Sequence, residues 1–534
     1  MCLWSGGWLT NRSELGTAGP GTSDGELAAA LVDRHGEDAV ARLRGSLAAV
    51  LWQPARRRLL AFCDRMGERP LFYAPLSGGP PPEVLLSPAL DGLLAALPRR
   101  PAADPASVRC HLEGAAPPRG RTFWDGVREV PPAGLLVLDE RVLRLCSYWE
   151  VAARPTLRLA SDEEYADVFR GVLEQAVRDA LPESAVGVTL SAGLDSTAVA
   201  CALRDVGGRR RIIAVRWIAP ELPEADEDAT SGAVARELGL EDLPIRADRH
   251  WPLRGASPPL TRRSSPLRLP FQEAWEETFR RAAEAGIAVL YTGSAGDHLF
   301  GGNAFSYPDL LLAGRWLRLV GELREHLPQS SLGLTGILRR MLFGPLVRSW
   351  LPRAAATVPW LGEALREVPA PEAPRVSRRL PPGRRARLRL LADPLLPQTT
   401  QLLARQAAPY GIDLRHPYRD DRVVELAAAL PITQTFRAAR RKIVVRNAYG
   451  RRLPPAVTAG WDKIYPAAIA HRGLRERETE RVWALLDRMV TAGRGWVDAP
   501  VLREEYRRYL AGETESTFFW YALTLEAWAR EHLA

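Results

Sequence analysis

The chain of 534 residues contains very little lysine and few cysteines. Only Lys442 and Lys463 of its 72 basic residues are lysines, and the other 70 are arginines. Because arginine serves wherever a general positive charge suffices, the two lysines mark positions that need a compact, strongly hydrated ammonium. The five cysteines are scattered, odd in number and without a C-x-x-C spacing, which argues against a disulfide framework or a zinc cluster.

Long apolar runs are also missing. None approaches the roughly 20 residues of a membrane-spanning helix, and the first residues lack the pattern of a secretion signal. We therefore expect a cytoplasmic protein with no transmembrane segment. The net charge of +9 would permit nucleic-acid binding, but the arginines are spread along the chain without an aromatic–basic motif, so no nucleic-acid partner is predicted.

The pattern of apolar residues divides the chain into two domains. Residues 1–150 contain short apolar runs between glycine and proline turns, with one helical stretch near 24–35, which is typical of an α+β sheet domain. From residue 162 to about 300, strands and helices alternate, as in a parallel sheet with crossover helices. We place the second domain at 160–534 and expect its final stretch, Phe518–Trp528, to be a buried closing helix.

Residues 303–395 are rich in arginine, leucine and proline, and we interpret them as a helical insertion over the core. The segments at 310–316 and 337–343 are amphipathic and basic. Such segments can contact a membrane or a partner helix, although packing between domains is the commoner use of an apolar helix face.

A loop of small residues follows the apolar strand at 186–190. It contains Asp195 and leads into a helix for which Ser196 is a plausible N-cap. Small residues let phosphate oxygens approach backbone N–H groups, and a helix N-terminus favours an anion. The chain has no Gly-Lys pair, which excludes a Walker A loop, and a carboxylate among phosphates implies Mg²⁺. An ordinary strand-to-helix turn explains the same residues.

A second loop of this kind follows the strand at 287–291. Thr292 and Gly293 begin it, and Asp297 lies within it. Because the carboxyl ends of parallel strands meet at one edge of a sheet, Asp195 and Asp297 are expected to hold one Mg²⁺ between them. The strand at 211–217, which contains Val215, could line an adenine pocket with its backbone groups.

These loops resemble the pyrophosphate loop of ATP pyrophosphatases. Together with the segments at 412–422 and 453–463 they resemble the synthetase half of the asparagine synthetase B family. The segments at 23–26, 36–45, 64–73, 123–126 and 148–150 are similar to the glutaminase half of the same family. The resemblance implies an Ntn-hydrolase-type sandwich followed by an adenine nucleotide α-hydrolase-like α/β synthetase domain.

The resemblance also implies chemistry and cofactors. A substrate carboxylate would attack the α-phosphate of ATP, and an amine would then attack the acyl-AMP. Lys463 matches the family's catalytic lysine, and Lys442 matches a second lysine in a K-x-x-x-R helix. Residues matched to ATP and pyrophosphate binding are Leu190, Ser191, Gly193, Asp195, Ser196, Val215, Thr292 and Gly293, with Asp195 and Asp297 on the metal.

The first domain departs from the family's glutaminase. The segment from Gly6 to Asn11 matches a family segment that lies well inside that domain, so Cys2 does not fall where the nucleophile belongs. Gly6 stands where the family has the asparagine of the oxyanion hole, and acyl transfer from glutamine needs both groups. We therefore expect a truncated, inactive domain that supports the synthetase.

Ser294 stands where asparagine synthetase has a glutamate, which weakens an asparagine-forming interpretation. Two relatives that use an amine of their own substrate remain: β-lactam synthetases and lasso peptide cyclases. The degenerate first domain, Ser294 and the insertion at 303–395 favour a lasso cyclase. A lasso cyclase implies a precursor peptide as substrate, with a leader peptidase and a leader-binding protein as partners. An asparagine synthetase and an inactive peptide-binding scaffold stay as alternatives.

Overall fold

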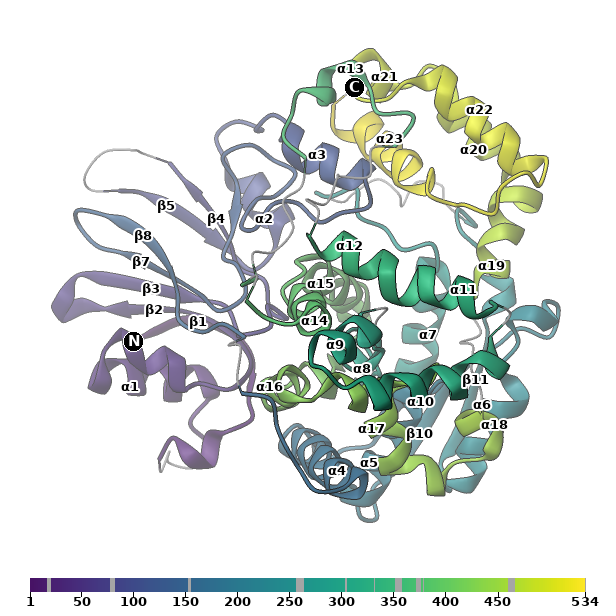
Figure 1. Cartoon of the computed structure of the whole chain (residues 1–534). Coiled ribbons are helices and arrows are strands. Elements are labelled where there is room, and N and C mark those ends of the chain that lie inside the picture. Colours follow the sequence, from purple (N-terminus) through teal and green to yellow (C-terminus); the bar gives the residue numbers. More distant parts are fainter. Residues whose placement is uncertain are drawn as a thin grey trace.

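The computed structural model of the chain is shown in Figure 1. It describes residues 1–16, 21–76, 82–151, 155–255, 264–302, 305–330, 332–350, 358–370, 376–377, 379–459 and 466–533.

Two antiparallel sheets make up the amino-terminal sandwich, and helices cover their outer faces. The larger sheet has the order β1 (Cys2–Leu9), β2 (Gly45–Gln53), β3 (Arg58–Phe62), β7 (Gly134–Leu138) and β8 (Leu143–Ser147). The smaller has the order β5 (Val84–Ser87), β4 (Phe72–Pro75) and β6 (Arg128–Glu129). Alternation along β2 explains the layers: Leu47 and Leu51 pack under α1 (Asp24–His35), whereas Ala48 and Val50 face the second sheet. The predicted α+β sandwich and its helix near 24–35 are thus present.

The second domain is built on a five-stranded sheet in which every neighbouring pair is parallel. Its order is β11 (Glu241–Arg246), β10 (Ile212–Ile218), β9 (Val186–Thr189), β12 (Val289–Tyr291) and β13 (Asp413–Arg415). The predicted parallel sheet is confirmed. The sequence analysis did not anticipate β13, which joins the sheet more than 100 residues after β12 because the helical insertion separates them in the chain.

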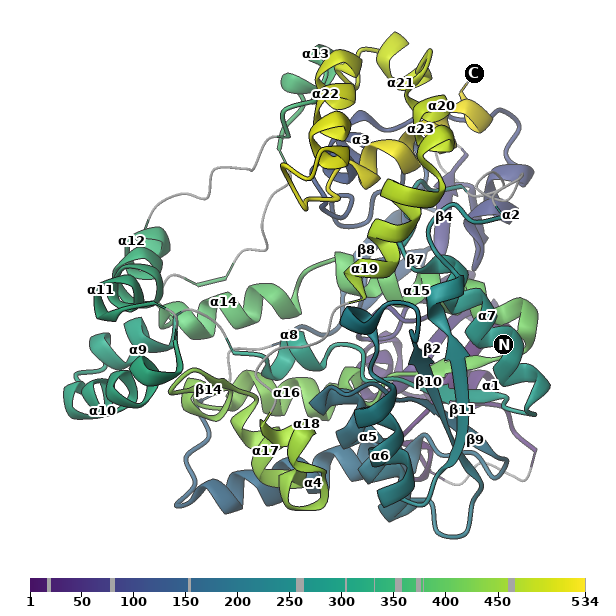
Figure 2. The same cartoon turned by 90° about the vertical axis from the view of Figure 1, so that its right-hand side faces the viewer.

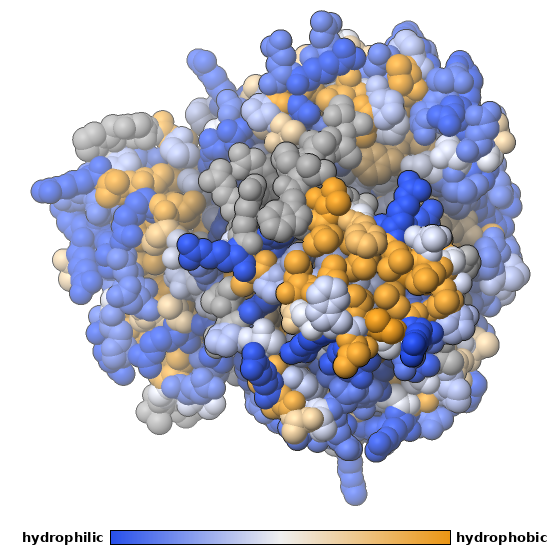
Figure 3. All heavy atoms as spheres, viewed as in Figure 1, coloured by the Kyte–Doolittle hydropathy of each residue, from blue (hydrophilic) through white to orange (hydrophobic). Residues whose placement is uncertain are grey.

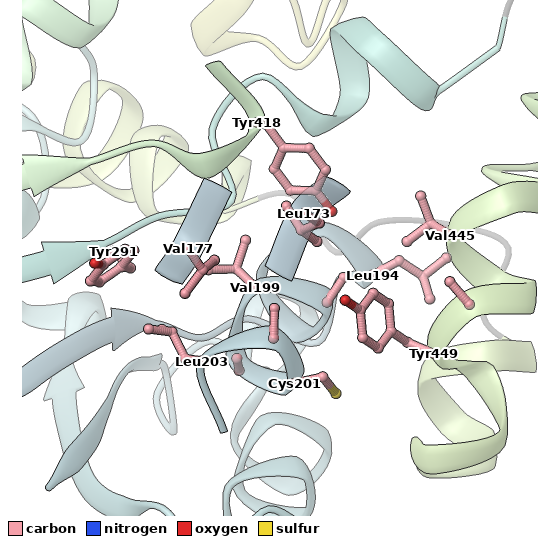
Figure 4. Packing of buried hydrophobic residues seen from close by; sticks show 14 of the residues in the cluster. Leu173, Val177, Leu194, Val199, Cys201, Leu203, Tyr291, Tyr418, Val445 and Tyr449 are labelled. Atoms are coloured by element: carbon pink, nitrogen blue, oxygen red, sulfur yellow. The ribbon is translucent and has the colours of Figure 1, made fainter. Parts of the chain in front are cut away.

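Helices cover both faces of this sheet. One layer contains α4 (Asp162–Asp179), α5 (Leu194–Val206), α6 (Asp228–Glu237), α16 (Asp421–Ala429) and α17 (Ile443–Tyr449). Figure 4 shows side chains of α4, α5 and α17 packed together with Tyr291 and Tyr418. The other layer contains α7 (Gln272–Glu284) and α15 (Leu395–Ala407). The order of strands reverses at β9, whose neighbours β10 and β12 lie on opposite sides, and ligands of open α/β sheets bind at such a point.

The insertion forms helices that stand apart from the sheet (Figure 2). They are α9 (Ser306–Leu312), α10 (Trp316–His326), α11 (Leu334–Ile337) and α12 (Gly344–Trp350), with a π-helical turn at Leu338–Phe343. Of the other two helices in this stretch, α13 (Glu363–Arg366) lies among the carboxyl-terminal helices and α14 (Pro382–Leu391) contacts the sheet domain. A small core of their own, which includes Tyr307, Leu319 and Ile337, holds α9 to α11 together with the π-helical turn.

The last helices pack on the amino-terminal sandwich. They are α20 (Thr479–Leu486), α21 (Val490–Gly493), α22 (Ala499–Leu510) and α23 (Trp520–His532), whereas α19 (Ala467–His471) packs on the parallel-sheet domain through Ile469. The predicted closing helix is α23, which is buried along most of its length. Its Trp528 ring lies 5.2 Å from the ring of Trp124, near α3 (Pro105–Leu112) (Figure 1). Among the described helices, none combines the length and apolarity needed to cross a bilayer.

Candidate active site

The loop after β9 is held by two serines. The Ser196 hydroxyl accepts the Ser191 N–H at 3.1 Å and lies 2.8 Å from the Ser191 hydroxyl. The Ser191 hydroxyl in turn accepts the Gly193 N–H at 3.2 Å. Our assignment of Ser196 as the N-cap is wrong, because α5 begins at Leu194 and Gly193 is its N-cap, without a side-chain cap. The serine pair instead holds the loop closed. Because glycine has no side chain, Gly193 cannot cap the first N–H groups of α5.

The loop after β12 packs closely against the start of α5. A Cβ atom on Gly293 would come within 2.7 Å of the Ser196 nitrogen, and one on Gly296 within 2.3 Å of the Asp195 carboxyl carbon. Thr292 is buried, and its hydroxyl lies 2.6 Å from Nδ1 of His416. The two loops therefore interlock through glycines, as expected for adjacent parallel strands.

Lys442 joins the two loops. Its Nζ lies 2.6 Å from Oδ2 of Asp195 and 2.6 Å from Oδ1 of Asp297. The three residues come from different elements: α5, the short helix α8 (Gly296–Phe300), and the residue before α17. Lys442 follows the hairpin of β14 (Phe436–Arg437) and β15 (Arg440–Arg441), and its backbone has a φ of +58°. Lys442 and Asp195 are buried, whereas the Asp297 side chain is 45% exposed and opens the cluster to solvent.

The charges of this cluster suit a divalent cation and a polyphosphate. Two carboxylates around one ammonium leave one negative charge, and buried charge needs compensation. Among the described residues, no three histidine, cysteine, aspartate or glutamate side chains gather in a metal-binding arrangement. Asp195 and Asp297 would supply two oxygen ligands, and phosphate oxygens and water would supply the others. Mg²⁺ is commonly held in this way in nucleotide sites. The residues present fit that ion.

Two family models match the chain. The model of the asparagine synthase family matches residues 168–530, which include both loops and Lys442. The chain belongs to the asparagine synthase family. A glutamine amidotransferase domain model matches residues 10–149, a stretch that begins after Cys2 and Gly6.

Three curated relatives share part of the chain. The protein "Amidase chyE" of Penicillium rubens is 28% identical over 318 residues, 54% of this chain and 44% of its own length. "Amidase chry2" of Gibberella zeae is 31% identical over 34% of this chain and 26% of its own. "Asparagine synthetase [glutamine-hydrolyzing] 3" of Bacillus subtilis is 29% identical over 33% and 28%. The matched part thus spans less than half the length of each relative.

Two residues of the family-like segment 412–422 support the cluster and were not assigned a role from the sequence. The Tyr418 hydroxyl donates to the Asp195 carbonyl at 3.4 Å, and burial, followed by the Asp195 charge, raises the pKa of this phenol well above its ordinary value. Burial, followed by the charge of Arg419, lowers the pKa of His416 to about 3. Both side chains are therefore neutral near pH 7, and the His416–Thr292 contact does not titrate there.

The three acidic residues at 226–228 contact different parts of the structure. Glu227 Oε2 accepts the Ala192 N–H at 3.1 Å, so this carboxylate reaches the loop after β9. Asp226 accepts the Ala219 N–H at 2.8 Å, and Asp228 pairs with Arg216 at 2.8 Å. From the sequence, this run could be a metal relay or an acidic cluster at a helix N-terminus; the structure shows a direct contact between Glu227 and the candidate phosphate loop.

Two predicted ATP residues lie inside the sheet. The Leu190 N–H donates to the Val215 carbonyl at 2.9 Å, and both side chains are buried. The Val215 side chain packs in the α7–α15 layer, on the other face from α5. Val215 is therefore separated from the Asp195–Asp297–Lys442 cluster, and β10 continues past it to Ile218. Lys463 lies outside the described residues.

A cavity of about 1000 Å³ lies between α4 and α17, and the residues that line it do not include Lys442, Asp195 or Asp297. Most of its charged lining is basic. The arginines are Arg170, Arg440, Arg446, Arg451 and Arg452, and the acids are Asp162 and Glu163. A cavity with this excess of positive charge suits an acidic ligand.

Proposed function

We propose that the chain is an ATP-dependent amide-forming synthetase that closes a ring in a peptide. It adenylates an Asp or Glu side chain of the peptide and couples it to the peptide's amino terminus. The observation that carries the proposal is the meeting of Asp195 and Asp297 on Lys442 at the switch point of the parallel sheet. ATP and Mg²⁺ are the cofactors that the proposal requires.

The reaction has two steps. A carboxylate oxygen of the substrate forms a bond to the α-phosphorus of ATP, and the bond to pyrophosphate breaks. The amine nitrogen then attacks the acyl carbon, AMP leaves, and the amine loses a proton. The net result is one amide, AMP, pyrophosphate and the removal of the elements of water.

The roles of the residues follow from their charges. The start of α5 and the Lys442 ammonium place positive charge where phosphates leave. Asp195 and Asp297 are the residues that would hold Mg²⁺, which supplies further positive charge to the pyrophosphate when bound. By its match to the family's catalytic lysine, Lys463 is proposed to stabilise charge at the acyl centre.

The choice of a peptide substrate, as in the lasso cyclases, rests on three features. Ser294 stands where asparagine synthetase has a glutamate, the cavity between α4 and α17 is lined by five arginines, and the insertion adds helices outside the sheet. A leader peptidase and a leader-binding protein belong to this proposal as partners.

Asparagine formation is the second candidate, because the Bacillus subtilis relative carries the name of a glutamine-hydrolysing asparagine synthetase. It requires ammonia from glutamine. We propose that the amino-terminal domain does not release ammonia and instead supports the synthetase domain. Gly6 occupies the matched asparagine position, and a Cβ there would come within 2.9 Å of the Trp4 ring, so the segment is packed around glycine.

Pyrophosphate release tests the proposal. A candidate precursor peptide with a free amino terminus should lose the mass of one water only with enzyme, ATP and Mg²⁺. Asp195→Asn should lower pyrophosphate release about a hundredfold or more, because it removes charge at the phosphate site. Asp487→Asn is the control, since the Asp487 side chain is 68% exposed and pairs with the neighbouring Arg488.

The other candidates give different outcomes. Pyrophosphate release that requires aspartate and glutamine and is abolished by Cys2→Ala would establish asparagine formation. It would contradict both the peptide substrate and the proposal that the amino-terminal domain releases no ammonia. Ring closure in a small amino acid would indicate a β-lactam synthetase-like enzyme. Peptide binding without any ATP-dependent pyrophosphate release would indicate a scaffold and overturn the proposed activity.

A further inference from the structure

Exposed apolar side chains concentrate on the inserted helices. In the described part of the chain, sixteen large hydrophobic side chains are exposed, and eight of them lie between residues 312 and 347. Figure 3 shows a continuous apolar area over α10 to α12. We define the insertion surface by Leu312, Trp316, Leu317, Val320, Phe343 and Val347.

This surface is not the inner face of the inserted helices. Leu310, Leu319 and Leu342 of the same helices already pack inward around Tyr307. The side chains of the insertion surface do not join this packing: Leu317 is 93% exposed and Trp316 is 62% exposed. Packing between domains, the use expected from the sequence, therefore accounts for only one face. An exposed apolar area of this kind marks a contact with another molecule or with a membrane.

Positive charge surrounds the insertion surface. The exposed basic residues of the same helices and turns are Arg315, Arg318, Arg324, Arg339 and Arg340. Of the acids in this stretch, Glu322 is buried against Arg318 and Asp309 accepts the Gly383 N–H, which leaves Glu325 exposed. The surface is thus apolar with a rim that is mostly basic, and it is complementary to an anionic partner.

We propose that the insertion surface binds the face of a lipid bilayer that contains anionic phospholipids. At the start of α10, Arg315 and Arg318 flank Trp316 and Leu317 directly. Cores of protein–protein interfaces are depleted of charge, whereas at a bilayer an arginine stem lies along the acyl region while its guanidinium reaches phosphate. Tryptophan and leucine on a basic amphipathic helix are typical of helices that lie in the interface plane.

The proposal is independent of the reaction at Lys442. It assigns the chain a peripheral association through side chains that insert to headgroup depth, held by apolar burial and by charge. Binding is expected to weaken as salt is raised, because screening reduces the contribution of the arginines.

Vesicle co-sedimentation of the full chain provides the test. Wild-type protein should sediment with vesicles of phosphatidylcholine and phosphatidylglycerol and remain in the supernatant with phosphatidylcholine alone. Leu317→Ser should weaken partitioning about tenfold, the effect of losing one buried leucine side chain. Leu145→Ser, at another exposed leucine on β8, is the matched control and should bind as wild type.

A second variant separates charge from apolar burial. Arg339→Gln with Arg340→Gln should weaken binding to the anionic vesicles and flatten its salt dependence, with an unchanged unfolding midpoint. Failure of the wild type to sediment, or equal binding by both leucine variants, would overturn the proposal. Self-association in light scattering that is lost in Leu317→Ser would also overturn it, because the surface would then be a protein interface.

Discussion

At the scale of single residues, the scarcity of lysine was the most informative feature of the composition. One of the two lysines lies between two aspartates at 2.6 Å from each. An ammonium is a compact charge with three donors that can point to different elements, whereas a guanidinium is a larger, planar fork. The geometry at Lys442 therefore gives a physical reason for a lysine in a chain that otherwise uses arginine.

A half-buried glutamate in the amino-terminal domain predicts that stability depends on pH. Burial raises the pKa of Glu129 from its ordinary 4.5 to about 7, and the Gln401 amide, which donates to it at 2.9 Å, opposes the shift. Because the folded state keeps a proton that the unfolded chain has released, stability falls as pH rises from about 4.5 to about 7 and is level above that.

Glu129→Gln should remove this fall. Above pH 7 the variant should be more stable than the wild type by up to about 3 kcal/mol, and the difference should vanish below the unfolded pKa. Urea unfolding at acid and at alkaline pH measures the difference. Glu140→Gln, at an exposed carboxylate, serves as control. A constant difference across the pH range would show that Glu129 does not titrate as stated.

At the scale of elements, the two loops function as one unit because glycines let them touch. Gly296 is the closest case, since a Cβ there would come within 2.6 Å of Asp195 Oδ1. The strand and helix patterns predicted both loops, because apolar periodicity is a local property. The same patterns could not show that Gly296 lies against Asp195, which depends on how β9 and β12 pair.

Gly296→Ala should therefore displace the Asp195 carboxylate from Lys442. We expect pyrophosphate formation to fall roughly a hundredfold, the usual result of misplacing a reacting group by about 1 Å. Gly171→Ala on α4 is the control, because a Cβ there meets no atom within 4 Å and alanine favours a helix. Normal activity of Gly296→Ala would indicate that the loops do not interlock during catalysis.

At the scale of the whole molecule, buried ion pairs join the sandwich to the parallel-sheet domain. Arg419 donates to Glu68 at 3.0 Å and also to the Met66 carbonyl, and Arg65 pairs with Asp421. Arg415 lies over the Trp8 ring at 4.8 Å. The segment at 64–73, which the sequence showed only as similar to a glutaminase, thus supplies a large part of the contact between domains.

Loss of one partner in this contact should be costly. Arg419→Met leaves Glu68 buried without its cation and should lower stability by about 3 kcal/mol, whereas Arg419→Met with Glu68→Gln should recover part of that loss. Thermal unfolding of the single and double variants measures the interaction free energy between Arg419 and Glu68. Strictly additive losses would contradict a direct pair across the interface.

The sequence by itself determined the local units: a sandwich helix at 24–35, alternating strands and helices after residue 162, and two small-residue loops that each contain one aspartate. These follow from periodicity and turn chemistry within a few residues of each position. Tertiary structure alone decided which distant segments meet. It brought Lys442 to Asp195 across 247 positions, packed α23 on the sandwich, added β13 to the sheet and left Trp316 and Leu317 exposed. The reason is that such contacts depend on the shape and burial of whole layers, which no single stretch of sequence contains.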